Sequence, residues 1–145
     1  MINELLRSLQ PDGVAELALV NKAARESTDP ELLELCRCLI VAMLEEKAPH
    51  PLTDPVVPGL AADKIAALDD RAESVAFSPL ERAALEFTEQ FVISVSTMSD
   101  EQVEVLRAHL GDEKTYAFAA ALYVIEMTER LRIISGVVFG NERHS

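Results

Sequence analysis

Apolar residues recur along this chain at intervals of three and four, which is the period of an α-helix. The clearest stripe runs through Leu80, Ala84, Phe87 and Phe91, and a shorter one covers residues 103–110. No segment shows the strict alternation of apolar and polar residues that is typical of a strand. The pattern therefore predicts an all-α protein, a helical bundle of about six to seven helices.

Two segments are apolar enough to be central helices, namely residues 32–44 and residues 115–138. The apolar residues of the second are Phe118, Leu122, Ile125, Leu131, Ile134 and Val138. A helix of that composition is expected to be buried on more than one side.

Three further helices are predicted from weaker patterns, at about 2–9, 14–26 and 61–68. The first two are separated by Pro11-Asp12-Gly13, a composition that favours a turn. We therefore expect two short helices there with a turn between them.

Several helix starts carry explicit signals. Ser78 is followed by a proline and then by Glu81, which together predict a capping box. Ser99 and Gln102 repeat the spacing, and Asp29 precedes a proline that suits the first helical position. These residues fix where three of the helices should begin.

The 145 residues are expected to form one helical domain over 1–145. Glycine is scarce, and four of the seven prolines gather in one segment. That segment predicts a proline-rich loop at about 48–59.

The formal net charge of −12 excludes some classes of partner. Nucleic-acid binding needs a basic face, and so does binding to an anionic membrane. No membrane-spanning segment or signal peptide is visible. We expect a cytoplasmic protein with no nucleic-acid partner and no membrane partner.

The two cysteines, Cys36 and Cys38, are two positions apart in the predicted helix 32–44. Residues with that spacing point to nearly opposite sides of a helix, so their thiols cannot form a disulfide with each other there. We interpret both as small buried apolar side chains.

Candidate acid–base chemistry centres on three residues. Glu34 lies in an apolar helix, while Glu46 and His50 lie at the mouth of the proline-rich loop. A carboxylate and an imidazole can shuttle protons or bind a metal. Their spacing matches no specific metal signature, and a solvated loop histidine is the simpler interpretation, so we expect no metal and no cofactor.

Charged residues also interrupt the second central helix. Glu126 and Arg130 are four positions apart and can form an ion pair on one helical face. We expect this face to meet solvent or another subunit; a buried pair would instead need to be well hydrogen-bonded or would mark a functional cavity.

Four segments, in order, resemble the carboxymuconolactone decarboxylase-like superfamily, which includes the alkylhydroperoxidase D proteins. They are residues 62–68 (ADKIAAL), 77–87 (FSPLERAALEF), 98–103 (MSDEQV) and the pair 129–131 (ERL) and 135–137 (SGV). The resemblance covers roughly residues 31–138. It implies an all-helical fold of the alkylhydroperoxidase D type and assembly as a homo-oligomer, from dimer to hexamer.

The reactive motif of that family is a Glu, then a Cys-x-x-Cys about twelve residues later, then a His. With Glu34 on the family's Glu, the cysteine positions hold Glu46 and Pro49, and the His position holds Thr53. The resemblance therefore implies a degenerate site without the redox pair, in which only Glu34 carries over.

Two functions remain open at this point. The first is a protein without thiol peroxidase activity, acting as a binding or structural homo-oligomer, with a small molecule as a possible ligand. The second is an acid–base enzyme of decarboxylase or lactone type, in which Glu34 works with Glu46 or His50 in a pocket beside the loop. Residual peroxidase activity through Cys36 or Cys38 is a weaker third.

Overall fold

The computed structural model describes residues 8–45 and 62–138 of the 145. These residues form six α-helices and two short 3-10 helices, with no strand among them. The α-helices are α2 (Pro11–Glu26), α3 (Pro30–Glu45), α4 (Ala62–Ala66), α5 (Pro79–Ser94), α6 (Asp100–Leu110) and α7 (Asp112–Val138). The 3-10 helices are η1 (Ala67–Asp70) and η2 (Val95–Thr97). The all-α prediction is confirmed.

The predicted helix starts are confirmed at α5 and α6. Ser78 and Ser99 each accept a hydrogen bond from the backbone of the third helical residue, and Glu81 and Gln102 reciprocate. Both capping boxes satisfy amide groups that a helix start would otherwise leave unpaired. Gly111, at φ 82°, ends α6 and lets α7 begin at the next residue.

The predicted turn at Pro11-Asp12-Gly13 is wrong. These residues are the first turn of α2, which begins at Pro11. Proline has a preset φ and no amide hydrogen, so it fits the first helical position as well as it fits a turn. Of the predicted helix 2–9, only Ser8 and Leu9 lie within the described residues, and both are helical.

The core surrounds α3, which packs against both α5 and α7. Its apolar side chains are almost fully enclosed: Leu32, Leu33, Leu35, Leu39, Ile40 and Val41 are all buried. From the other helices come Ala84 and Phe87 of α5, Leu106 of α6, and Phe118, Leu122 and Ile125 of α7. The predicted apolar stripes therefore do face the interior.

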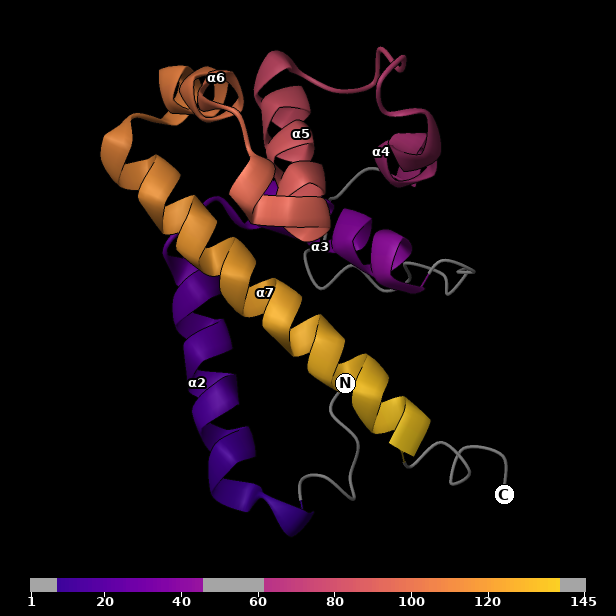
Figure 1. Ribbon diagram of the computed structural model, residues 1–145, viewed down its shortest axis with the longest axis vertical. Coiled ribbons are helices and arrows are strands. Elements are labelled where there is room, and N and C mark those ends of the chain that lie inside the picture. Colours follow the sequence, from indigo (N-terminus) through magenta and orange to yellow (C-terminus); the bar gives the residue numbers. More distant parts are fainter. Residues whose placement is uncertain (1–7, 46–61, 139–145) are drawn as a thin grey trace.

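Helix α7 runs diagonally across the front of the molecule, and α2 lies beside it (Figure 1). Both helices extend below the body formed by α3, α5 and α6. Asn21 ties them together, since its amide nitrogen donates to the Thr128 hydroxyl at 2.9 Å. No helix within residues 8–45 and 62–138 is long and apolar enough to cross a membrane.

The expectation that the second central helix is buried on more than one side is wrong for α7. Ile134 is 58% exposed, and Tyr116 and Tyr123 are also exposed on this helix. The burial of α7 is confined to the face that meets α2, α3 and α6. Composition predicted how apolar the helix is, but the number of neighbours decided how much of it is covered.

Candidate functional site

Glu34, the one candidate carried over from the family resemblance, lies in the first half of α3. Its side chain has no exposed surface, in spite of its charge. A buried carboxylate needs compensating charges and hydrogen bonds, because burial without them costs several kcal/mol, roughly. The partners of Glu34 therefore decide what it can do.

Both carboxylate oxygens of Glu34 accept hydrogen bonds from Arg37, one helical turn further along α3. The Arg37 Nε donates at 2.9 Å and 3.0 Å, and Nη2 donates at 2.6 Å. Arg25 of α2 adds a third nitrogen, Nη1, at 3.4 Å from Oε1. Such a forked arrangement is a strong and well-defined form of carboxylate recognition.

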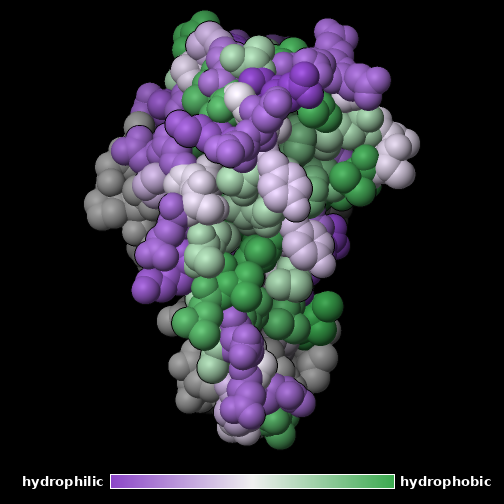
Figure 2. Space-filling model, turned by 90° about the vertical axis from the view of Figure 1, so that its left-hand side faces the viewer, coloured by the Kyte–Doolittle hydropathy of each residue, from purple (hydrophilic) through white to green (hydrophobic). Residues whose placement is uncertain are grey.

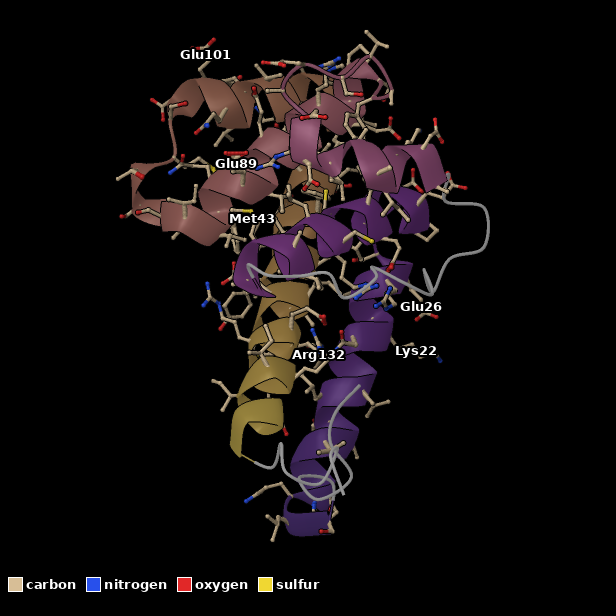
Figure 3. The ribbon with its side chains drawn as sticks, turned by 90° about the vertical axis from the view of Figure 1, so that its right-hand side faces the viewer. Lys22, Glu26, Met43, Glu89, Glu101 and Arg132 are labelled. Atoms are coloured by element: carbon tan, nitrogen blue, oxygen red, sulfur yellow. The ribbon has the colours of Figure 1, made fainter. Side chains whose placement is uncertain are left out.

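The network continues into α7 through Glu129, which is also buried. Its Oε1 lies 3.5 Å from Arg37 Nη1 and 3.3 Å from Arg132 Nε. Figure 3 shows Arg132 on the side of α7 that faces α2. We call this set the buried charge cluster: Arg25, Glu34, Arg37, Glu129 and Arg132.

The buried charge cluster joins α2 and α3, which follow one another in the chain, to the distant helix α7. Arg37 is its centre, because it contacts both carboxylates. Burial disfavours the charged form of Arg37, but the hydrogen bond and charge of Glu34, followed by the charge of Glu129, outweigh that and raise the pKa of Arg37. The buried charge cluster therefore links α2, α3 and α7 through ion pairs.

Sequence reasoning missed Glu129 and chose Glu126 and Arg130 instead. That pair does form, with Arg130 Nε 2.9 Å from Glu126 Oε1. The Arg130 side chain is 49% exposed and the Glu126 side chain is 16% exposed, so the pair lies at the edge of the surface, and the exposure of the guanidinium group keeps its energetic value small. The i,i+3 spacing of Glu34 with Arg37 and of Glu129 with Arg132 was the available signal.

The chemistry of Glu34 is restricted by its neighbours. A proton relay needs a partner whose protonation changes, whereas a guanidinium group stays protonated in proteins. The remaining neighbour is the Cys38 thiol, whose sulfur lies 3.9 Å from Glu34 Oε2. Within the described residues, Glu34 therefore has charge partners and no proton-accepting partner.

Cys36 and Cys38 are free, buried thiols, as predicted. They face different surroundings: Cys36 lies near Thr88 of α5, whereas the Cys38 sulfur lies near Glu34. Burial raises the pKa of Cys36 to about 12, and burial together with the charge of Glu34 raises the pKa of Cys38 to about 11. Since the thiolate is the reactive form, neither thiol is suited to attack a peroxide.

Glu46, His50 and the proline-rich loop at 48–59 lie outside the described residues. The pocket expected beside that loop is outside them as well. Among the residues that are described, no three His, Cys, Asp or Glu side chains gather in a metal-binding arrangement.

Cavities in the described part of the chain include two large ones that lie away from Glu34. One, of about 520 Å³, is lined by the polar connection between α2 and α3, residues 26–29, together with Leu32, Leu80, His109, Leu110 and Lys114. The other, of about 340 Å³, is lined by Leu85 and polar residues of α5, by Arg71 and Ala72 from the segment before that helix, and by Gln102 of α6. Arg71 Nη2 donates a hydrogen bond to Glu89 Oε1 at 2.7 Å, so two of the charged side chains that line this cavity are already paired with each other.

Comparisons with models of known protein families and with curated proteins found no match for this chain.

Proposed function

We propose that this chain is a helical binding or structural protein that assembles with copies of itself in the cytoplasm and has no thiol peroxidase activity. It would be a member of the carboxymuconolactone decarboxylase-like superfamily with a degenerate site. A small molecule is a possible ligand.

The observation that carries this proposal is the state of the two thiols. A thiol peroxidase needs one accessible sulfur that ionises and a second that resolves the oxidised product. Cys36 and Cys38 are both buried, with pKa values raised to about 12 and about 11. Their different surroundings also argue against a disulfide between them.

The acid–base alternative receives less support. Both oxygens of Glu34 already accept hydrogen bonds from Arg37, and the carboxylate has no contact with solvent. A buried ion pair of this kind positions helices relative to one another. We therefore assign Glu34 a structural role in the buried charge cluster, which links α2, α3 and α7.

Thiol titration tests the proposal. The native protein is treated with an aromatic disulfide reagent before and after one equivalent of an organic hydroperoxide, and the denatured protein serves as the control that must yield two thiols. We expect both thiols to stay unreactive until denaturant is added, and the hydroperoxide to consume neither. Loss of two thiols to hydroperoxide, reversed by a reductant, would refute the proposal.

A further inference from the structure

The outer face of α7 carries a stripe of residues that no described element covers. We call it the outer stripe: Tyr116, Ala120, Tyr123, Met127, Arg130 and Ile134. Its large apolar members are well exposed, Tyr116 at 78%, Tyr123 at 59%, Met127 at 38% and Ile134 at 58%. Side chains of this kind on one helix face mark an interaction surface more often than an ordinary exterior.

The spacing of the outer stripe is that of a coiled-coil seam. Successive members are separated by four, three, four, three and four residues, which is the heptad repeat. The stripe runs over 19 residues, from Tyr116 to Ile134, or about 27 Å of helix. The opposite side of α7 holds Phe118, Leu122 and Ile125 in the core of its own chain. One helix thus has an inner face for its own chain and an outer face with the pattern of helix–helix packing.

Figure 1 shows that α7 crosses the front of the molecule with no described helix in front of it. Figure 2 shows apolar side chains gathered in the middle of the face where α2 and α7 lie side by side, between more polar regions above and below. On α2, Leu19 is 65% exposed and Val20 is 42% exposed. The α2–α7 pair therefore offers more apolar surface than the outer stripe alone.

The outer stripe is symmetric about its midpoint at position 125. Tyr116 and Ile134 are equally distant from that midpoint, and so are Tyr123 and Met127. If a second α7 packs antiparallel across this point, large apolar side chains face each other at four of the six stripe positions. A surface that complements itself in this way fits a two-fold interface between identical chains.

The charge on the outer stripe fits the same occupant. Its one charged member, Arg130, is paired with Glu126 at 2.9 Å in its own helix. In the antiparallel arrangement Arg130 faces Ala120, whose small side chain leaves room for the guanidinium group. The net charge of −12 opposes association of two chains, but the stripe itself places no unpaired like charges against each other.

We infer that two copies of this chain associate through the outer stripe, with their α7 helices antiparallel and Tyr123 of one copy against Met127 of the other. This interface rests on the homo-oligomer proposed above and specifies where the copies meet. In the dimer, the outer face of α7 becomes buried, as its composition suggested.

Single and double charge substitutions test the interface, with the dissociation constant measured by sedimentation velocity. We expect Tyr123→Glu and Met127→Lys each to raise the dissociation constant by at least about 30-fold, since each puts a charge into an apolar seam. The double variant should recover much of the affinity, because antiparallel packing sets each new carboxylate against a new ammonium group. In a parallel pair, like charges would face each other and the double variant would recover nothing.

Val105→Lys is the matched control, because Val105 of α6 is 42% exposed and lies outside the outer stripe. It should leave the dissociation constant unchanged, and circular dichroism should show that all the variants are folded. A monomeric wild-type protein would overturn both this interface and the proposed oligomer. An oligomer that tolerates both single substitutions would overturn the interface alone, and loss of affinity without recovery in the double variant would overturn the antiparallel pairing.

Discussion

Helices α3 and α7 are similar in composition, but they are buried to different extents in the fold. Both are long apolar segments interrupted by a few charges. Helix α3 is covered on nearly all sides by α5 and α7, and its charged Glu34 is compensated inside the chain. Helix α7 is covered on one side only, and its outer face keeps Tyr116 and Ile134 in contact with solvent.

The difference shows that the apolar content of a helix does not determine whether its own chain or a second molecule covers it. The chain itself supplies every neighbour of α3, including the guanidinium groups that its carboxylate needs. For α7 the chain supplies neighbours for the inner face, and the outer stripe keeps a pattern suited to another helix. Three measurements test whether α3 and α7 differ in this way.

The largest effect is expected from Arg37→Ala in α3. Removing the guanidinium group leaves Glu34 buried with only the more distant Arg25, and breaking a buried pair in this way costs about 3–5 kcal/mol. Urea denaturation followed by circular dichroism measures the change in the free energy of unfolding. The matched control is Arg107→Ala in α6, whose ion pairs are exposed and which should cost about 1 kcal/mol or less. Equal costs for the two variants would contradict the role of the buried charge cluster.

The two faces of α7 can be compared with a single residue type. Ile125 is 1% exposed and Ile134 is 58% exposed. Ile125→Ala should lower the free energy of unfolding by about 2–5 kcal/mol, because it leaves a cavity in the core. Ile134→Ala should lower it by about 0.5 kcal/mol or less when measured at protein concentrations low enough for the chains to be separate. A large cost for Ile134→Ala under those conditions would mean that the chain covers its own outer stripe.

The smallest effect concerns the thiols of α3 and depends on pH. The folded-state pKa values of Cys36 and Cys38 are raised to about 12 and about 11, above the ordinary value of about 8.5 in the unfolded chain. A raised folded-state pKa gives stability that is present below pH 8.5 and lost as the pH rises toward the folded values. For two thiols, the free energy of unfolding should fall by about 2 kcal/mol between pH 8.5 and 9.5. The Cys36→Ala/Cys38→Ala variant should show a much flatter profile in urea denaturation over this range, and an unchanged slope would show that other groups cause the loss.

Much of the fold could be predicted because its signals are local. Ser78 with Glu81 predicts the start of α5, and the spacing of the apolar residues predicts which side of α5 and α6 faces inward. The turn at Pro11 was mispredicted because proline is compatible with both a turn and the first position of a helix. Only the continuation of the chain into α2 decides between them.

The candidate site was predictable only in part. Glu34 stood out as a charge in an apolar helix, and its partner Arg37 is readable from the i,i+3 spacing. Glu129 could not be assigned to the same cluster, because its contact with Arg37 joins residues 92 positions apart. Local spacing carries no information on which two helices will pack together.

Local patterns in the amino-acid sequence are enough to predict the helical class, the starts of α5 and α6, the inward faces of those helices and the helical geometry that keeps the two cysteines apart. These properties follow from hydrogen bonding and side-chain periodicity within a few residues. The tertiary structure alone decided that Glu34 is held by arginines from two helices, that Glu129 joins it, and that α7 is buried on one side only. Those outcomes depend on which distant surfaces meet, because the free energy of burying a charge or an apolar face is set by the neighbours that cover it.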